Sequence, residues 1–286
     1  MGEEMVFLND NEIRFCRKDI IGRGGNGVVF RGSFSGQNVA VKRIQLIDAN
    51  YELNSRELLN LRQLKHDNIV EFIHVEDNDD FRFIVFELCY ANLREYCKPV
   101  YTGQVLSDES DQLKVLLQLT QALEYIHSKD IIHRDIKPEN ILVSNKDSVK
   151  MKWADFGHSK LTNERGSTSM SGRRGTKAWL AKEIIPFFNR DELGGRCSKN
   201  SDIFAAGCVF FYFLTRGIHP YGEENRLIEQ NILSENIVNK NGKIERRSCC
   251  QKTCHSNDGR TIGFGESYRM SQCISFLDEF RPLRVI

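Results

Sequence analysis

The sequence predicts an α+β protein of two lobes, with a small antiparallel sheet and one helix followed by a larger helical lobe. Two features predict this fold. Short β-branched and aromatic runs separated by glycines fill residues 15–43, as in the strands and turns of an antiparallel sheet. After Leu88 the apolar residues recur at helical spacing. Strands at the start and helices after them favour two lobes, with a boundary near residues 88–92.

The first part of the chain predicts several strands and one helix. The expected strands contain residues 20–21, 28–30, 39–41, 69–75 and 81–88. A glycine-rich turn separates the first two strands, Gly36 marks the next turn, and the acidic run 77–80 joins the last two strands. Residues 50–64 change period, because their leucines fall near helical spacing with charged residues between them. They supply the one helix of the small lobe.

Two long helices are expected in the second part. Residues 109–128 carry a broad apolar face, and residues 199–216 are apolar nearly all round, which predicts burial. The longest apolar run, from Ile203 to Leu214, contains Gly207 and is shorter than the roughly 20 residues that span a bilayer. We therefore expect no membrane segment in this chain. Residues 240–262 are polar and poorly periodic, so their structure is left open.

Composition and charge exclude some classes of function. Of the 286 residues, 40% are hydrophobic and 28% charged, which is enough apolar material for a core. A net charge of +1 gives no direct nucleic-acid signal, so any phosphate binding must come from a local site. The nine cysteines favour reduced thiols and a cytoplasmic protein. Cysteines at 249, 250 and 254 with His255 suggest zinc, but their spacing favours a polar tail with thiols.

A glycine-rich turn at residues 22–29 matches the pattern G-x-G-x-x-G-x-V. Glycines let the backbone approach a triphosphate closely, because a Cβ would block the approach. The same pattern opens dinucleotide-binding folds, where a helix follows the glycines. Here Val28–Phe30 is β-branched and aromatic, so a strand follows and a dinucleotide-binding domain is disfavoured.

A lysine ends the apolar strand that follows this turn. Lys42 is either a surface cation with its stem along the strand or a clamp on the α- and β-phosphates of a nucleotide. A clamp needs a carboxylate to hold it, and Glu57 on the predicted helix is the natural partner. Glu52 competes for that role, but helix phase places it on a different face.

Two polar segments follow apolar strands in the second part. In the loop His133–Asn140, Asp135 is suited to accept or orient a hydroxyl proton, Lys137 to neutralise a moving phosphoryl group, and Asn140 to bind a metal through its amide oxygen. Asp155, in the run Asp-Phe-Gly, offers the oxygen ligands that Mg²⁺ prefers.

The glycine turn, the lysine, the H-R-D-x-K-x-x-N loop and the D-F-G run, in this order, resemble the signature set of eukaryotic protein kinases. The resemblance covers about residues 18–220. It implies a two-lobed protein-kinase-like fold in a single domain over 1–286, with an N-lobe at about 15–88 and a C-lobe at about 92–286. The lysine two residues after the catalytic aspartate resembles the serine/threonine group, so the implied reaction is transfer of phosphate from ATP to protein hydroxyls.

The resemblance also implies roles for individual residues. Asp135, Lys137 and Lys42 are the implied catalytic residues, and Asn140 and Asp155 the implied Mg²⁺ ligands. The implied ATP-binding residues are Ile21, Gly22, Arg23, Gly24, Gly25, Asn26, Gly27, Val29, Ala40, Lys42, Glu57, Glu87, Cys89 and Leu142. Of these, Val29 and Ala40 pack over the adenine with Leu142 as the floor, while Glu87 and Cys89 offer the hinge carbonyl and amide. Asp202 anchors the backbone of the catalytic loop.

The stretch between Asp155 and Glu183 resembles an activation segment. Its hydroxyls at residues 167, 168, 169 and 171 predict autophosphorylation, with Arg134 as a partner for the phosphate. Thr176 resembles the position that helps select serine or threonine acceptors. Lys182 stands where the family's A-P-E element has proline, which leaves the end of the segment less rigid. Arg281 is the candidate partner of Glu183.

Local runs such as Ser201–Phe210 and His219–Gly222 resemble the kinase portion of the inositol-requiring unfolded-protein-response kinase/endoribonuclease family. This resemblance implies a homodimer for trans-autophosphorylation and a place on the cytosolic face of the endoplasmic reticulum if the chain is part of a longer membrane protein. Two alternatives stay open. One is an ATP-binding regulatory module that controls dimerisation or a nuclease partner. The other is a metabolite kinase, which is disfavoured because such a kinase lacks an activation segment.

Overall fold

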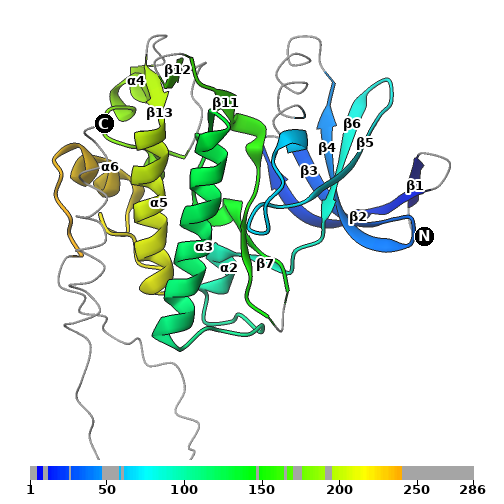
Figure 1. Cartoon of the computed structure of the whole chain (residues 1–286), viewed down its shortest axis with the longest axis horizontal. Coiled ribbons are helices and arrows are strands. Elements are labelled where there is room, and N and C mark those ends of the chain that lie inside the picture. The colour runs from blue at the N-terminus through cyan, green and yellow to red at the C-terminus, as the bar shows by residue number, and fades with distance from the viewer. Residues whose placement is uncertain are drawn as a thin grey trace, which may run out of the picture.

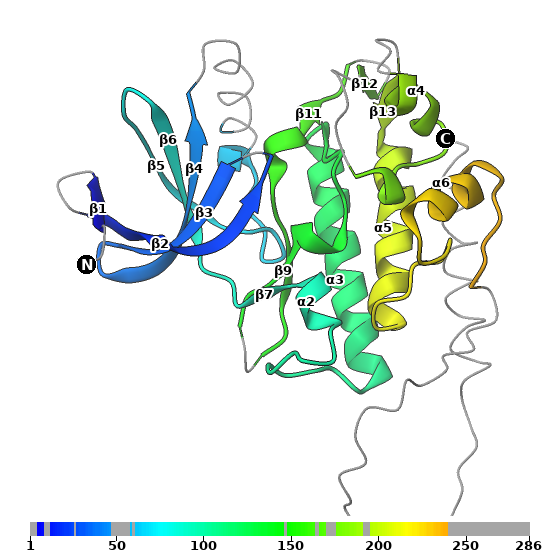
Figure 2. The ribbon, with the colours of Figure 1, turned by 180° about the vertical axis from the view of Figure 1, so that it is seen from behind.

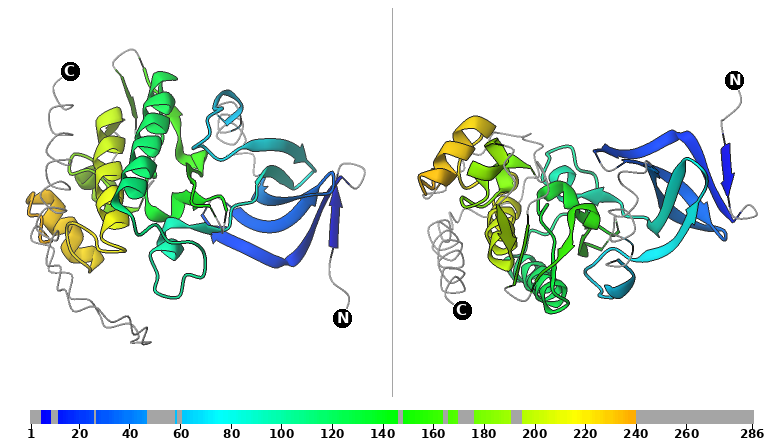
Figure 3. Two further views of the ribbon diagram at one scale, coloured as in Figure 1. Left: turned by 60° about the horizontal axis from the view of Figure 1, so that its bottom comes forward. Right: turned by 90° about the horizontal axis from the view of Figure 1, so that it is seen from above.

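The computed structural model describes residues 5–8, 12–25, 27–46, 58, 61–145, 148–163, 166–169, 176–190 and 195–239. Figure 1 shows a sheet on one side of the molecule and a body of helices on the other. The two views of Figure 3 keep the sheet to one side of the helices. The chain therefore has two lobes, as the sequence predicts.

The small lobe is one antiparallel sheet of six strands in the order β1-β2-β3-β4-β6-β5. The strands are β1 Met5–Leu8, β2 Ile13–Gly24, β3 Gly27–Phe34, β4 Gln37–Gln45, β5 Phe72–Asp77 and β6 Phe81–Glu87. β4 is central, and its Lys42 lies opposite Val29 on β3 and Ile84 on β6. Ser35 and Gly36 both adopt positive φ, which makes the predicted tight turn between β3 and β4.

Alternating side chains on these strands bury one face of the sheet. Its core contains Phe15, Phe30, Val41, Phe83 and Val85, all at most 2% exposed. The rings of Phe15 and Phe30 lie 4.8 Å apart between centroids. Only one register of each strand buries its apolar residues on this face. The packing therefore also fixes where Lys42 of β4 lies relative to the neighbouring strands β3 and β6.

The large lobe is built around two long helices, α3 Glu109–Ser128 and α5 Lys199–Leu214. The second is buried along most of its length, as its all-round apolar sequence predicts. Trp153 is fully buried beside α3 and donates its ring N–H to the Leu119 carbonyl at 2.9 Å. The shorter elements are β7 Ala91–Asn92, α2 Leu93–Tyr96, β8 Ile131–Ile132, η2 Pro138–Asn140, β9 Ile141–Val143, β10 Met151–Trp153, η3 Phe156–His158, β11 Lys160–Leu161, β12 Ser167–Ser169, η4 Lys177–Trp179, α4 Ile185–Arg190, β13 Arg196–Ser198 and α6 Asn225–Leu233.

The chain crosses from the sheet to the helical lobe after β6 (Figure 2). A second connection runs through Ile69, which forms a parallel bridge with Trp153 of β10. The backbone N–H of Val70 also donates to the Trp153 carbonyl, so Val70 bonds to the helical lobe instead of entering the sheet. The strand predicted at 69–75 therefore begins only at Phe72. The predicted helix at 50–64 is seen only at Leu58 and residues 61–63, and its remainder lies outside the described residues.

In the part of the chain that the structure describes, no helix combines the length and the apolarity needed to cross a bilayer.

Candidate functional site

Lys42 of the sheet and Asp155 of the helical lobe meet at the junction of the two lobes. The Lys42 ammonium donates to Asp155 Oδ1 at 2.8 Å, and the lysine side chain is only 9% exposed. The anchored register of β4 aims Lys42 at this junction. The predicted partner Glu57 and its competitor Glu52 both lie outside the described residues.

Asp155 occupies a strained and strongly charged position. Burial by itself would raise the pKa of its carboxyl, but the Lys42 ammonium outweighs burial and, with His158 and His133, holds the pKa below its usual range. Its φ of 59° and ψ of 72° lie in the left-handed region, which a non-glycine residue adopts at a cost of about 1–3 kcal/mol. Arg134 is also left-handed, with φ of 67°. The site therefore holds an ionised carboxylate in a fixed direction.

Asp135 and Asn140 complete a chain of contacts that ends at Lys42. Asn140 Nδ2 donates to the Asp135 carbonyl at 2.7 Å and to its carboxylate at 2.9 Å. The backbone N–H of Ala154, next to Asp155, donates to the Asn140 carbonyl at 2.9 Å. These bonds join four residues that are distant in sequence, and they agree with the convergence that the motifs predict.

The Asp135 carboxylate is oriented by a lysine and faces a threonine hydroxyl. Lys137 Nζ donates to Asp135 Oδ2 at 2.7 Å and to Thr176 Oγ1 at 3.1 Å. Thr176 Oγ1 lies 3.5 Å from Asp135 Oδ1. The side chain of Asp135 is 3% exposed. One of its oxygens is therefore held by two donors, while the other faces the Thr176 hydroxyl.

Asp202, at the start of α5, holds the loop that carries Asp135. Its carboxylate accepts the backbone N–H groups of His133 at 2.7 Å and Arg134 at 2.9 Å. His127 Nε2 lies 3.0 Å from Asp202 Oδ2, a contact that no sequence motif suggested because His127 lies inside the regular pattern of α3. Since Asp202 is 2% exposed, these bonds are shielded from water and fix the left-handed turn at Arg134.

The glycine-rich turn joins β2 to β3, with Gly24 opposite Gly27. A Cβ at Gly27 would lie 2.3 Å from the Arg43 carbonyl oxygen, so the close approach of β4 requires glycine there. A Cβ at Gly24 or Gly25 would meet no atom within 4 Å. Packing within the protein therefore does not explain these two glycines, whereas a phosphate lying against the backbone would. Asn26, between them and Gly27, lies outside the described residues.

The predicted adenine-binding residues come from both lobes. Val29 pairs with Lys42, Ala40 pairs with Phe86, and Leu142 is half-buried on β9. Glu87 ends β6, and Cys89 follows it in the connection to β7. Burial, helped by the Glu87 charge, raises the pKa of the Cys89 thiol to about 12, so it stays protonated at neutral pH.

The predicted Mg²⁺ ligands fit that metal by their chemistry. Asn140 donates to Asp135 from its amide nitrogen, which turns its amide oxygen away from Asp135. The side chain of Asp155 is 30% exposed, and its carboxylate has a second oxygen, Oδ2, besides the Oδ1 that accepts from Lys42. Within the described residues no three His, Cys, Asp or Glu side chains gather as a metal cage. Two oxygen ligands suit Mg²⁺, which takes its remaining ligands from water and substrate phosphates.

Part of the predicted activation segment is described. Ser167–Ser169 forms β12, which pairs with β13 and leaves Thr168 only 5% exposed. Ser169 is exposed and accepts from Lys160 Nζ at 3.0 Å, while its carbonyl accepts from Arg134. Ser171 and the candidate pairing partner of Glu183, Arg281, lie outside the described residues, as does the cluster of cysteines with His255.

Lys182, which stands at the family's proline position, forms an ion pair with Glu235 beyond α6. Asn189 and Lys177 both contact Glu229 on the same helix. The end of the segment is thus tethered by side chains, which the sequence did not reveal. These contacts stand at the place where the family's proline is missing.

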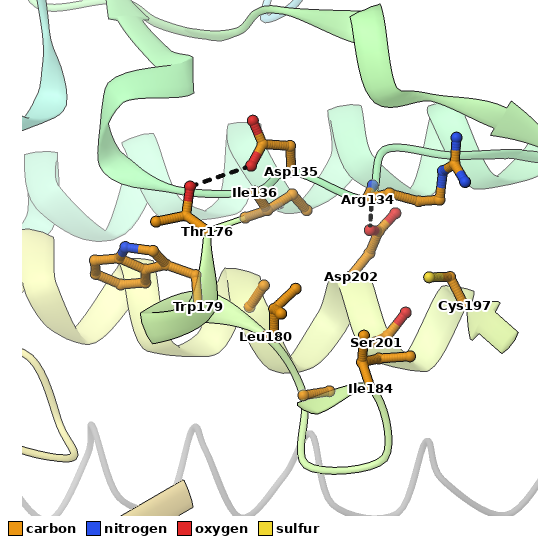
Figure 4. Close-up of a pocket in the computed structure, with 12 residues that line it drawn as sticks. Arg134, Asp135, Ile136, Thr176, Trp179, Leu180, Ile184, Cys197, Ser201 and Asp202 are labelled. Atoms are coloured by element: carbon orange, nitrogen blue, oxygen red, sulfur yellow. Dashed lines mark hydrogen bonds between the residues drawn. The ribbon is translucent and has the colours of Figure 1, made fainter. Parts of the chain in front are cut away.

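A small cavity lies directly below the loop that carries Asp135. Figure 4 shows Thr176 and Trp179 on one side of it and Cys197, Ser201 and Asp202 on the other. Its volume of about 20 Å³ is room for about one water molecule. The loop is therefore packed closely on α5 and η4, which supports its fixed geometry.

Comparisons with known proteins agree with this geometry. A family model described as "Protein kinase domain" matches residues 15–279. The human serine/threonine-protein kinase/endoribonuclease IRE2 is 40% identical over 220 residues, which cover 74% of this chain and 23% of that protein. The Caenorhabditis elegans serine/threonine-protein kinase/endoribonuclease ire-1 is 31% identical over 240 residues, or 80% of this chain and 24% of that protein.

A third relative is the Schizosaccharomyces pombe sensor for unfolded proteins in the ER ire1, which is 34% identical over 241 residues, or 76% of this chain. The chain spans about a quarter of the length of these relatives, with 23%, 24% and 22% covered.

Proposed function

The chain belongs to the protein kinase family, in its serine/threonine group, and from that premise we propose that it binds ATP with Mg²⁺ and phosphorylates serine or threonine hydroxyls of proteins. The observation that carries this proposal is the contact between Lys42 and Asp155 at 2.8 Å, joined through Ala154 and Asn140 to Asp135. A surface lysine would not need a carboxylate from the other lobe. A phosphate clamp at the junction of two lobes does need one.

Lys42 and the glycine turn are the proposed phosphate-binding groups. The ammonium of Lys42 is paired with Asp155, and Lys42 lies opposite Val29 on β3, the strand that follows the glycine turn. When ATP binds, that charge would contact the α- and β-phosphates and fix the nucleotide along the strand. Bound Mg²⁺, with Asp155 and Asn140 as its protein ligands, would supply charge neutralisation of the phosphates.

Asp135 is the proposed catalytic aspartate. Lys137 and Asn140 hold Asp135 Oδ2, which leaves Oδ1 to accept the proton of the acceptor hydroxyl. The Thr176 hydroxyl, 3.5 Å from Oδ1, lies where an incoming hydroxyl would sit and therefore borders the acceptor site. Because phosphoryl transfer needs positioning and charge stabilisation more than covalent chemistry, this fixed carboxylate and the Lys137 ammonium beside it would supply the protein's part at the acceptor hydroxyl.

We propose that the segment containing β12 is an autophosphorylation target. Ser169 is exposed and lies beside Lys160, with Arg134 bonded to its carbonyl, so a phosphate there would meet two cations. Thr168 is buried in the pairing of β12 with β13, so it accepts phosphate only after that pairing opens.

The relatives suggest the wider setting. Their names describe kinase/endoribonucleases and a sensor for unfolded proteins in the ER. We propose that this chain acts in unfolded-protein-response signalling, with a second copy as partner for trans-autophosphorylation, and that it works in the cytoplasm or on the cytosolic face of the endoplasmic reticulum.

The experiment is a radiolabelled-ATP assay of the wild-type chain beside Asp135→Asn. Loss of the oriented carboxylate should lower ³²P incorporation about 10²-fold or more. Asp130→Asn is the matched control, since Asp130 lies in the same loop region but pairs with Lys199 at the surface, and its activity should stay within about twofold of wild type. Nucleotide binding without incorporation above Asp135→Asn would favour the regulatory module.

A further inference from the structure

A lysine from β10 holds the residue that ends β6. Lys152 Nζ and the backbone N–H of Glu71, the latter at 2.7 Å, both donate to Glu87 Oε1. The backbone N–H of Glu87 returns a bond to the Glu71 carbonyl at 3.1 Å. Glu87 is thus fixed through both its side chain and its backbone.

This ion pair is poorly exposed to water. The side chains of Lys152 and Glu87 are 11% and 22% exposed. A buried ammonium is stable only with a partner, and breaking such a pair by removing one member leaves an uncompensated charge. Loss of this pair should therefore disturb the local structure more than loss of an exposed surface ion pair, such as Lys150 with Asp67 at 3.0 Å.

The position of Lys152 connects three parts of the nucleotide site. Lys152 lies opposite Leu142 in the β9–β10 hairpin and three residues before Asp155. Its neighbour Trp153 bonds to Asn68 and Val70, which lead into β5. Through Glu87 the same lysine reaches the connection between the lobes. One side chain therefore sets the distance between the proposed adenine floor and the proposed hinge.

We propose that Lys152 is a positioning residue for adenine recognition, which acts by clamping the Glu87 carboxylate so that the backbone at residues 87–89 keeps a fixed distance from Leu142. This inference rests on the proposed function, because it presumes that adenine binds between those elements. Lys152 touches no substrate. Its effect is expected on the affinity for the adenosine part of the nucleotide, while the phosphate clamp at Lys42 is left unchanged.

The test measures dissociation constants for adenosine and for ADP with MgCl₂ by calorimetry on wild type, Lys152→Met and the control Lys150→Met. Lys152→Met should raise both constants by a similar factor of about ten, equivalent to about one lost hydrogen bond. Lys150→Met removes a lysine ion pair two residues away and should change neither constant by more than about twofold. A drop in folded fraction alone would lower the number of binding sites and leave the constants unchanged.

A second measurement tests whether the charges of Glu87 and Lys152 act at residue 89. Glu87 raises the pKa of the Cys89 thiol and Lys152 opposes that effect, so both charges are felt at residue 89. In nucleotide-free protein at pH 9, Glu87→Gln should therefore speed the alkylation of Cys89, and Lys152→Met should slow it. The rate of alkylation is measured by peptide mass spectrometry. Faster alkylation in Lys152→Met would instead show that its removal exposes Cys89, and it would contradict the expected charge effect.

If Lys152→Met does not fold, the double variant Glu87→Gln with Lys152→Met removes both charges and leaves no unpaired ion. It should fold and still bind adenosine about tenfold more weakly. Equal constants for wild type and the folded variant would overturn the positioning role alone. Absence of any adenosine or ADP binding by wild type would overturn the proposed function together with this inference.

Discussion

The imidazole of His219 allows a quantitative test of the packing around η4. The ring lies edge-on to Trp179 with 4.5 Å between centroids, and the residue is 5% exposed. Its Nδ1 accepts the backbone N–H of Tyr221 at 3.1 Å, which requires an unprotonated nitrogen. Burial lowers the pKa of His219 from 6.5 to about 4, and the nearby backbone of Ala178 opposes that shift only in part.

The sign of the pH dependence follows from this lowered pKa. Between pH 6.5 and about 4 the unfolded chain binds a proton at His219 that the folded chain does not, so stability is lost as the pH falls through that range. At about 1.36 kcal/mol per pH unit, the contribution reaches roughly 2.5 kcal/mol of lost unfolding free energy at pH 4.5. Above pH 6.5 His219 leaves the stability unchanged.

The assay is urea unfolding of wild type and His219→Asn at pH 7.5 and pH 4.5. Asparagine keeps an acceptor for the Tyr221 N–H but does not titrate, so the variant is less stable than wild type at pH 7.5 because of the smaller side chain. That difference should shrink by about 2–3 kcal/mol at pH 4.5. A difference that stays constant between the two pH values would refute the assignment of a buried neutral ring.

Three further predictions concern the site. Asp202→Asn replaces one acceptor oxygen by a donor facing backbone N–H groups, so kcat should fall about 10²-fold and Tm should drop, as measured by steady-state kinetics and calorimetry. Gly27→Ala should destabilise the chain by more than about 2 kcal/mol in chemical denaturation, since its Cβ would meet the Arg43 carbonyl, whereas Gly24→Ala should leave Tm unchanged and weaken ATP binding. Equal Tm losses for the two glycine variants would contradict the open backbone at Gly24. Lys182→Met should change unfolding free energy by less than about 1 kcal/mol, because Lys182 and Glu235 are 46% and 57% exposed, yet it should increase limited proteolysis near residues 176–184.

Much of the fold could be predicted from periodicity. The helices α3 and α5 match the predicted ranges closely, because long apolar faces give a strong helical signal. β1 was missed, since its four residues are too short to show alternation and its pairing with β2 depends on a turn. The pairing of β12 with β13 was also missed, because strands of three residues are too short to show alternation.

Only those residues of the candidate site that belong to short sequence motifs could be predicted. Lys42, Asp135, Asn140 and Asp155 stand in short ordered patterns, so their convergence was expected before the bonds between them were known. Contacts made by residues outside these patterns were invisible. Lys152 with Glu87 is 65 positions apart and follows no local rule, because long-range ion pairs depend on how elements pack.

The left-handed backbone at Arg134 and Asp155 has a consequence for engineering. Glycine would relax the backbone at both positions. At 155, however, it would leave the buried Lys42 ammonium without its carboxylate partner, and at 134 it would remove the bonds to the His158 and Ser169 carbonyls. A variant that nevertheless gained stability at either position would have lost a side chain that the proposed site uses. Libraries screened by melting temperature should therefore keep both positions fixed, since a gain there would mean loss of the proposed catalytic centre.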